Sequence, residues 1–181
     1  MKSRINYTLV YGSINTDLRV DFSYVYDTDP ENKYKSIREY PEHNSTYIRG
    51  NYSITISEGF GKARLFIPGG HMTCVLDILT RTIKAVGEHY KELYPHANLP
   101  EYDIDKTALD KFNREHTVLV NGYTAVPCIY ANSNNECNPA LRISSKRETV
   151  VVPLTDAIII AKKLDVFDAD TFGMMLLNML R

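Results

Sequence analysis

Basic and aromatic side chains at regular spacing are the residues of this sequence best suited to contact another molecule. They occupy alternate positions of segments in which polar and apolar residues take turns, so they share one face if the strands pair in order. Basic groups bind phosphates and aromatic rings stack on bases. The predicted binding set is Arg19, Arg49, Lys62, Arg64, Phe66 and Tyr47. The alternative is a solvated outer face, neutralised in part by Asp21 and Asp27.

Further basic residues lie in the segment 28–45, where prolines and asparagines interrupt the alternation and predict a long exposed loop. The segment carries Lys33, Lys35 and Arg38, together with Tyr34 and Tyr40. Because tyrosine is enriched at recognition surfaces, this loop is a candidate recognition arm. A mobile loop without a binding role is the alternative.

Acid–base catalysis has one candidate, the pair Glu115-His116 beside Lys111 and Arg114. These residues would suit an RNA-degrading nuclease that uses His116 for proton transfer. Histidine more often caps or packs, and the sequence contains no phosphate-binding loop or nucleophile motif. We therefore expect no catalytic residue and a protein that is not an enzyme.

Metal binding has only scattered candidates. His71 and Cys74 are three residues apart, whereas Cys128 and Cys137 are nine apart. Structural zinc sites normally show pairs of close ligands, so we expect no metal site and no cofactor.

Composition narrows the compartment and the partners. The 181 residues hold 21 Lys and Arg against 22 Asp and Glu, for a net charge of -1, so nucleic-acid binding needs a local basic patch. The three cysteines, an odd and sparse count, favour a reducing compartment. No apolar run is long enough to span a membrane, and no signal peptide is evident. A cytoplasmic protein without membrane contact is expected.

The elements that position these residues predict an α+β fold in two unequal halves, residues 1–95 and 96–181, each of antiparallel hairpins followed by a helix. In the first half, four strands precede one helix over 71–94, which should lie across one face of the four-stranded sheet. The first strand should turn Ile5, Tyr7, Leu9 and Tyr11 to the core. The core positions predicted for the next three strands are Leu18, Val20, Phe22, Tyr24 and Tyr26, then Ile48, Tyr52, Ile54 and Ile56, and then Ala63, Leu65 and Ile67. In the second half, we expect a helix over 105–115, a hairpin of 117–120 and 123–126 around Asn121-Gly122, a loop over 132–139, a further hairpin and two helices.

An internal repeat links the two halves. Asn51–Ser57 matches Asn138–Ser144 at an offset of 87, and Arg64–Pro68 matches Thr149–Pro153 at an offset of 85. Both matched segments then enter a helix. One interpretation is an ancestral duplication, and the other is that any hairpin followed by a helix looks like this.

The order of four strands and a helix, given twice, resembles the PC4-like and Whirly-like single-stranded nucleic-acid-binding proteins. The resemblance lies in element order over most of the chain and in no residue motif. It implies that the open sheet face, with Arg19, Arg49, Lys62, Arg64 and Phe66, binds strand backbones and bases.

In size and character the chain is also similar to type II anti-CRISPR proteins, which are phage and mobile-element inhibitors that bind Cas9. We therefore expect a non-catalytic binding or inhibitor protein whose partner is a nucleoprotein or single-stranded nucleic acid. A structural or assembly subunit is a further alternative. It would form a homodimer through an apolar stripe of Met174, Met175, Leu177 and Leu180.

Overall fold

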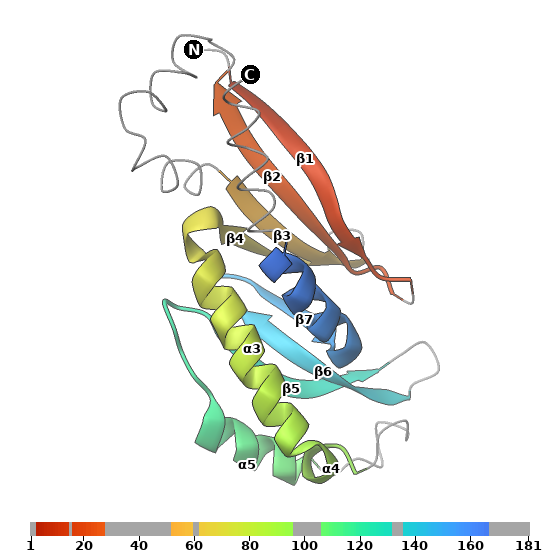
Figure 1. The fold of residues 1–181 in the computed structure, drawn as a ribbon. Helices are drawn as coiled ribbons and strands as arrows, with labels where there is room; N and C mark the ends of the chain where they lie inside the picture. The colour runs from red at the N-terminus through yellow and green to blue at the C-terminus, as the bar shows by residue number, and fades with distance from the viewer. Residues whose placement is uncertain are drawn as a thin grey trace.

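Two antiparallel sheets and their helices form an α+β fold in the computed structural model, which describes residues 3–14, 16–27, 52–59, 62–95, 106–131 and 136–166 (Figure 1). The first sheet has the order β1-β2-β3-β4 and the second the order β5-β6-β7. The strands are β1 Ser3–Gly12, β2 Arg19–Asp27, β3 Tyr52–Glu58, β4 Ala63–Pro68, β5 Thr124–Ala131, β6 Cys137–Ser144 and β7 Thr149–Pro153. The helices are η2 Gly69–His71, α3 Met72–Glu88, α4 Tyr90–Leu93, α5 Thr107–His116 and a helix over 154–166.

Alternation places one apolar face of the first sheet in the core, as predicted for β2, β3 and β4. The buried positions recur at every second residue. They are Val20, Phe22, Ile54, Ile56, Leu65 and Ile67.

Strand β1 departs from the prediction, because its register shifts between Leu9 and Tyr11. Such a bulge adds one residue and exchanges the two faces of the strand. Leu9 consequently lies opposite Asp21 and is 57% exposed, while Val10 and Tyr11 pack against the core. The predicted inward face, which included Leu9, is therefore wrong for this residue.

The helix predicted over 71–94 is broken into three parts. A 3-10 turn, η2, precedes α3, and α3 ends at Glu88 with His89 as its C-cap before the single turn of α4. Gly87 lowers the helix propensity at this end. Within the described residues, no helix combines the length and apolarity needed to cross a membrane.

The Asn121-Gly122 turn forms as predicted, but its first strand does not. Asn121 and Gly122 have positive φ angles of 52° and 83°, as a tight hairpin turn requires. Only an isolated bridge joins Val120 to Tyr123, and Leu119 is 69% exposed. Residues 117–119 are outside any strand, and Thr117 and Val118 instead line a pocket beside β5. Strand β6, in contrast, begins at Cys137, inside the predicted loop.

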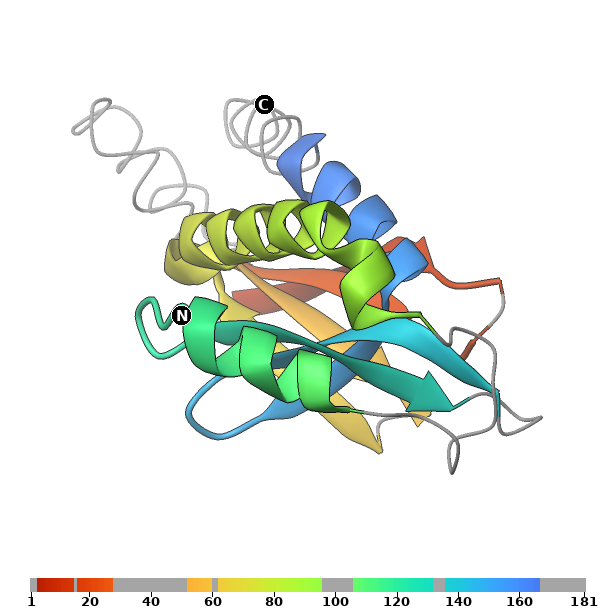
Figure 2. The ribbon, with the colours of Figure 1, turned by 90° about the horizontal axis from the view of Figure 1, so that it is seen from below.

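The two sheets lie side by side, with β4 next to β7. Helix α3 starts beside β4 and runs across the second sheet, where it contacts β5 (Figures 1 and 2). The prediction that this helix lies across the four-stranded sheet is therefore wrong for most of its length. One continuous cluster of buried apolar side chains includes residues of both halves, so the halves share a core.

The internal repeat extends to the buried positions of both hairpins and of the helices that follow them. Corresponding residues in the two halves are all buried and keep the two offsets found in the sequence. The pairs 87 residues apart are Ile54/Leu141 and Ile56/Ile143, and those 85 apart are Leu65/Val150, Ile67/Val152, Met72/Ala157, Val75/Ile160 and Leu79/Leu164. Constant spacing through a turn and a helix favours the duplication interpretation.

Three tyrosine hydroxyls make polar contacts between the two halves. The Tyr11 hydroxyl donates to the buried Asp156 carboxylate, which links β1 to the helix 154–166. The Tyr123 hydroxyl lies 2.8 Å from His71 Nδ1. The Tyr94 hydroxyl lies 3.0 Å from Cys128 O and 3.3 Å from Ala140 O.

The outer strand of the second sheet, β5, is capped by helix side chains. Thr82 Oγ1 of α3 donates to Ala125 O at 3.3 Å, and Asn113 Nδ2 of α5 donates to Pro127 O at 3.3 Å. Pro127 suits this edge, because proline has no N–H to offer to a further strand.

Replacing Tyr11 by phenylalanine is expected to lower the free energy of unfolding by about 1–3 kcal/mol, because the Asp156 carboxylate then loses a donor while buried. Urea denaturation measures the change. Tyr130→Phe, in the half-buried part of β5, is the matched control and should stay within about 0.5 kcal/mol. Equal effects of the two substitutions would contradict the role given to Tyr11.

Stability is expected to fall at alkaline pH because of Tyr94. Burial raises the pKa of the Tyr94 phenol well above its ordinary value, so the folded chain keeps the proton that the unfolded chain loses above about pH 10. Urea midpoints measured between pH 8 and pH 11 should decrease above pH 10, and less steeply in Tyr94→Phe. A midpoint that stays constant would count against this.

Candidate functional site

The first sheet carries two arginines in one transverse row on its polar face. Arg19 of β2 pairs with Ser57 of β3, and Ser57 pairs with Arg64 of β4. Paired residues of adjacent strands project to the same side, so both guanidinium groups belong to the face opposite the core. They lie two strand spacings apart, about 10 Å. The side chains of Arg19 and Arg64 are 56% and 68% exposed.

The next transverse row on this face, two residues away on β2, β3 and β4, has an apolar side chain on each of its two outer strands. Leu9, Asp21, Thr55 and Phe66 are paired in register across the four strands. Phe66 is 47% exposed and Leu9 is 57% exposed. The following row is polar, with a 2.8 Å hydrogen bond between the hydroxyls of Ser23 and Ser53, and there Ser53 is buried. Among the described side chains of this face, the exposed ones therefore lie at the end near the two hairpin turns.

Each arginine is held by a carboxylate. Arg19 donates to Asp21 through Nε at 2.8 Å and through a terminal nitrogen at 2.7 Å. Arg64 Nε lies 3.5 Å from Glu148, whose other carboxylate oxygen accepts the Phe66 backbone N–H at 3.0 Å. Glu148 thus binds the free edge of β4 and orients Arg64. The carboxylates leave the face close to neutral, which limits its attraction for phosphate.

Glu148 was not among the residues predicted from sequence. It lies between β6 and β7 in the second half, 84 residues beyond Arg64, and its contact depends on how the two sheets sit together. Leu9 was missed because the bulge in β1 exchanges its face. No local pattern signals either placement.

The other predicted binding residues are placed as follows. Lys62 is exposed in the turn before β4, where its side chain covers Gly59. Arg49, Tyr47, Lys33, Lys35 and Arg38 lie outside the described residues, as do Met174, Met175, Leu177 and Leu180 of the expected dimer stripe. The structure thus brings Arg19, Arg64 and Phe66 together on one face.

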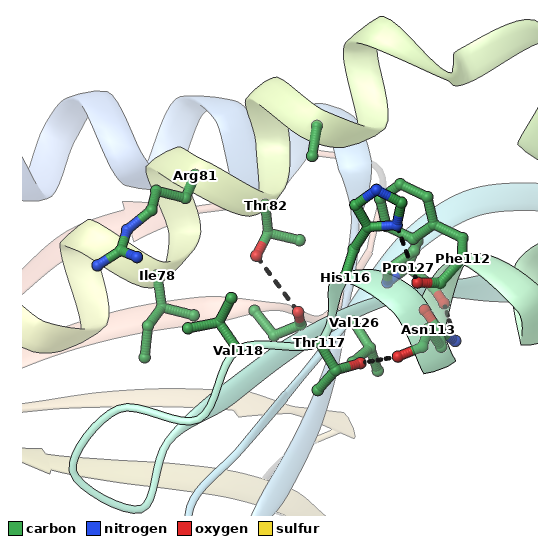
Figure 3. A pocket seen from close by; sticks show the side chains of 12 residues that line it. Ile78, Arg81, Thr82, Phe112, Asn113, His116, Thr117, Val118, Val126 and Pro127 are labelled. Carbon is green, nitrogen blue, oxygen red and sulfur yellow. Dashed lines mark hydrogen bonds between the residues drawn. The ribbon is translucent and has the colours of Figure 1, made fainter.

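A small pocket of about 200 Å³ opens between α3, α5 and β5 (Figure 3). Its walls are mainly apolar, and Arg81 on its rim is paired with Asp77. Asn113 Oδ1 is buried and has no hydrogen-bond partner, while the amide nitrogen of this residue caps β5. Pockets that bind drug-sized ligands are usually larger, so the pocket is a weaker candidate than the sheet face.

His116, the residue of the nuclease alternative, lies beside this pocket. Its Nδ1 atom is 3.2 Å from Phe112 O, and its ring stacks on that of Phe112 with centroids 4.4 Å apart. The ring of His89 is 5.5 Å from it, also between centroids. Within the described part of the chain, no carboxylate is hydrogen-bonded to His116.

The cysteines are separate from one another. Cys74, Cys128 and Cys137, which all lie within the described residues, are not joined by a disulfide, and burial raises the pKa of Cys128. Cys128 and Cys137 lie on adjacent strands but pair with Ala140 and Ala131. Among the described residues, no three His, Cys, Asp or Glu side chains are placed to hold one metal ion.

Comparison of the chain with protein-family models, with curated proteins and with solved structures found no match. The functional argument therefore depends on the geometry of the chain itself.

Proposed function

We propose that this chain is a non-catalytic binding protein whose first sheet, on the face bearing Arg19, Arg64 and Phe66, binds single-stranded nucleic acid. The observation that carries the proposal is the row Arg19–Ser57–Arg64, in which two exposed guanidinium groups share one face beside an exposed aromatic ring. This combination suits a strand whose phosphates and bases are both accessible.

The arginines supply the phosphate contacts in this proposal. A guanidinium has five N–H donors, and its carboxylate partner uses only some of them, so each arginine can also bind a phosphate. Asp21 and Glu148 hold the groups in place before the ligand arrives, which reduces the ordering cost of binding. With only two such contacts, the salt dependence should be shallow, with a slope of log K against log salt of about -1.4.

Phe66 supplies the stacking contact. Its ring is exposed and is adjacent to Arg64 in the register of β4. Stacking of one base on an aromatic ring contributes about 1–3 kcal/mol and is nearly independent of sequence. The proposal therefore describes a binder with little preference among bases.

A nucleoprotein is the second candidate partner, in line with the likeness to anti-CRISPR inhibitors of Cas9. It is favoured by the net charge of -1 and by the carboxylate beside each arginine. A surface of mixed charge is better matched to a nucleoprotein, which presents protein side chains beside an exposed nucleic-acid strand, than to nucleic acid alone.

Charge reversal at both arginines tests the proposal. Arg19→Glu with Arg64→Glu should weaken binding of a fluorescein-labelled single-stranded oligonucleotide by about tenfold or more, because both phosphate contacts are replaced by repulsion. Fluorescence anisotropy at fixed ionic strength measures the change. Phe66→Ala should weaken binding about fivefold or more at every salt concentration, since stacking is not screened.

The matched control is Lys84→Glu with Lys162→Glu, which changes the net charge by the same amount on exposed positions of α3 and of the helix 154–166. This control should bind like the unmodified chain. Equal weakening in both double variants would mean that only overall charge matters. Retained binding in Arg19→Glu with Arg64→Glu would overturn the site, and a pull-down of a Cas9–guide complex with the same variants tests the second candidate.

Glu148→Gln tests the proposal through a substitution that should increase the affinity for the oligonucleotide. The amide oxygen can still accept the Phe66 N–H, but the negative charge beside Arg64 is removed. Affinity for the oligonucleotide should increase while the urea midpoint changes little, because an exposed ion pair contributes at most about 1 kcal/mol. An unchanged affinity would show that Arg64 does not contact phosphate, whereas a decrease without loss of stability would show that the positioning of Arg64 by Glu148 outweighs the charge of the carboxylate.

A further inference from the structure

We propose that His89 and His116 form a two-imidazole site for a divalent transition-metal ion, of which zinc is the representative, at the ends of α3 and α5. The two rings lie 5.5 Å apart between centroids; His89 is the C-cap of α3, and His116 is the last residue of α5. The site is separate from the sheet face of the proposed function.

The tautomer of each neutral ring follows from its hydrogen bond. His89 Nδ1 lies 3.0 Å from Ala85 O, and His116 Nδ1 lies 3.2 Å from Phe112 O. A carbonyl oxygen can only accept, so each Nδ1 must carry the proton. In the neutral ring, Nε2 then keeps a lone pair. Metal-binding histidines have this arrangement, in which the other ring nitrogen donates to a carbonyl or carboxylate.

The spacing of the rings fits one shared ion. With zinc–nitrogen bonds of about 2.1 Å and a tetrahedral angle, the centres of two imidazoles on one ion lie about 5 Å apart. Figure 3 shows the second nitrogen of His116 directed away from Phe112 and toward the ribbon of α3, which His89 caps. A small adjustment of the rings therefore allows both Nε2 atoms to reach one ion.

The electrostatic surroundings favour a cation. The C-terminal end of a helix carries a partial negative charge, and His116 lies at the end of α5 while His89 lies at the end of α3, where it is also the N-cap of the four-residue α4. The face of Phe112 is stacked on His116 and limits the directions from which water reaches the ring. Imidazole nitrogen is a good ligand for zinc, copper and nickel, but not for magnesium or calcium. Water fills the remaining coordination positions, so removing either histidine should abolish chelation.

Zinc chloride titrated into the full chain at pH 7.5 tests the site, with binding followed by calorimetry and by the imidazole proton signals in NMR spectra. Of the five histidines, only the signals of His89 and His116 should shift or broaden at substoichiometric zinc. His89→Gln and His116→Gln should each weaken binding about tenfold or more. Zinc should also raise the thermal unfolding midpoint of the unmodified chain.

The matched control is His71→Gln, at the other end of α3, where Nδ1 is hydrogen-bonded to the Tyr123 hydroxyl. It removes one histidine but should leave zinc affinity unchanged. Magnesium chloride should cause no shift. The proposal is overturned if zinc at 1 mM leaves the two signals in place, or if either glutamine variant, shown by circular dichroism to be folded, binds zinc as well as the unmodified chain.

Discussion

Burial of apolar side chains from both halves in a single core is the constraint on which the remaining structure depends. Each hairpin presents one apolar face, and the helix that follows it presents an apolar stripe at the same relative positions, as the pairs Leu65/Val150 and Leu79/Leu164 illustrate. Neither half can bury these surfaces alone. Helix α3 leaves the first sheet and reaches β5, while the helix 154–166 is fastened to β1 through Asp156. Helix α3 and the helix 154–166 both pack against the buried core. The polar face of the first sheet therefore remains accessible at one end.

The fold class and most inward-facing positions could be read from sequence because they depend on local alternation. Val20, Phe22, Ile54 and Ile56 are examples, since burial at every second position is a property of the strand itself. The structure departs from the sequence prediction where contacts between residues distant in sequence determine the local conformation. The bulge at Leu9 reflects pairing with β2, and near Leu119 only the isolated bridge between Val120 and Tyr123 forms in place of the predicted strand pair. The helix over 71–94 was recognised, but its break at His89 depends on weak local propensity and on packing beside α5.

The candidate site shows the same division between local and distant information. The shared face of Arg19 and Arg64 follows from strand parity and hairpin pairing, both of which are visible in the sequence. The role of Glu148 cannot be inferred from these local patterns, because the contact forms only when the turn between β6 and β7 packs against β4. That turn changes the interpretation of the face. Arginines that look free in the sequence are already engaged, so binding should rest more on geometry and stacking than on charge.

The capping of β5 by Thr82 and Asn113 has a consequence for how this chain behaves in concentrated solution. An outer strand with unused acceptors is a template on which extended segments of other molecules add and polymerise. On β5 two of these acceptors, Ala125 O and Pro127 O, are occupied by side chains from two helices, and Pro127 offers no donor. This capping protects the second half against aggregation by strand addition. A mutation that displaces α5 would remove the protection.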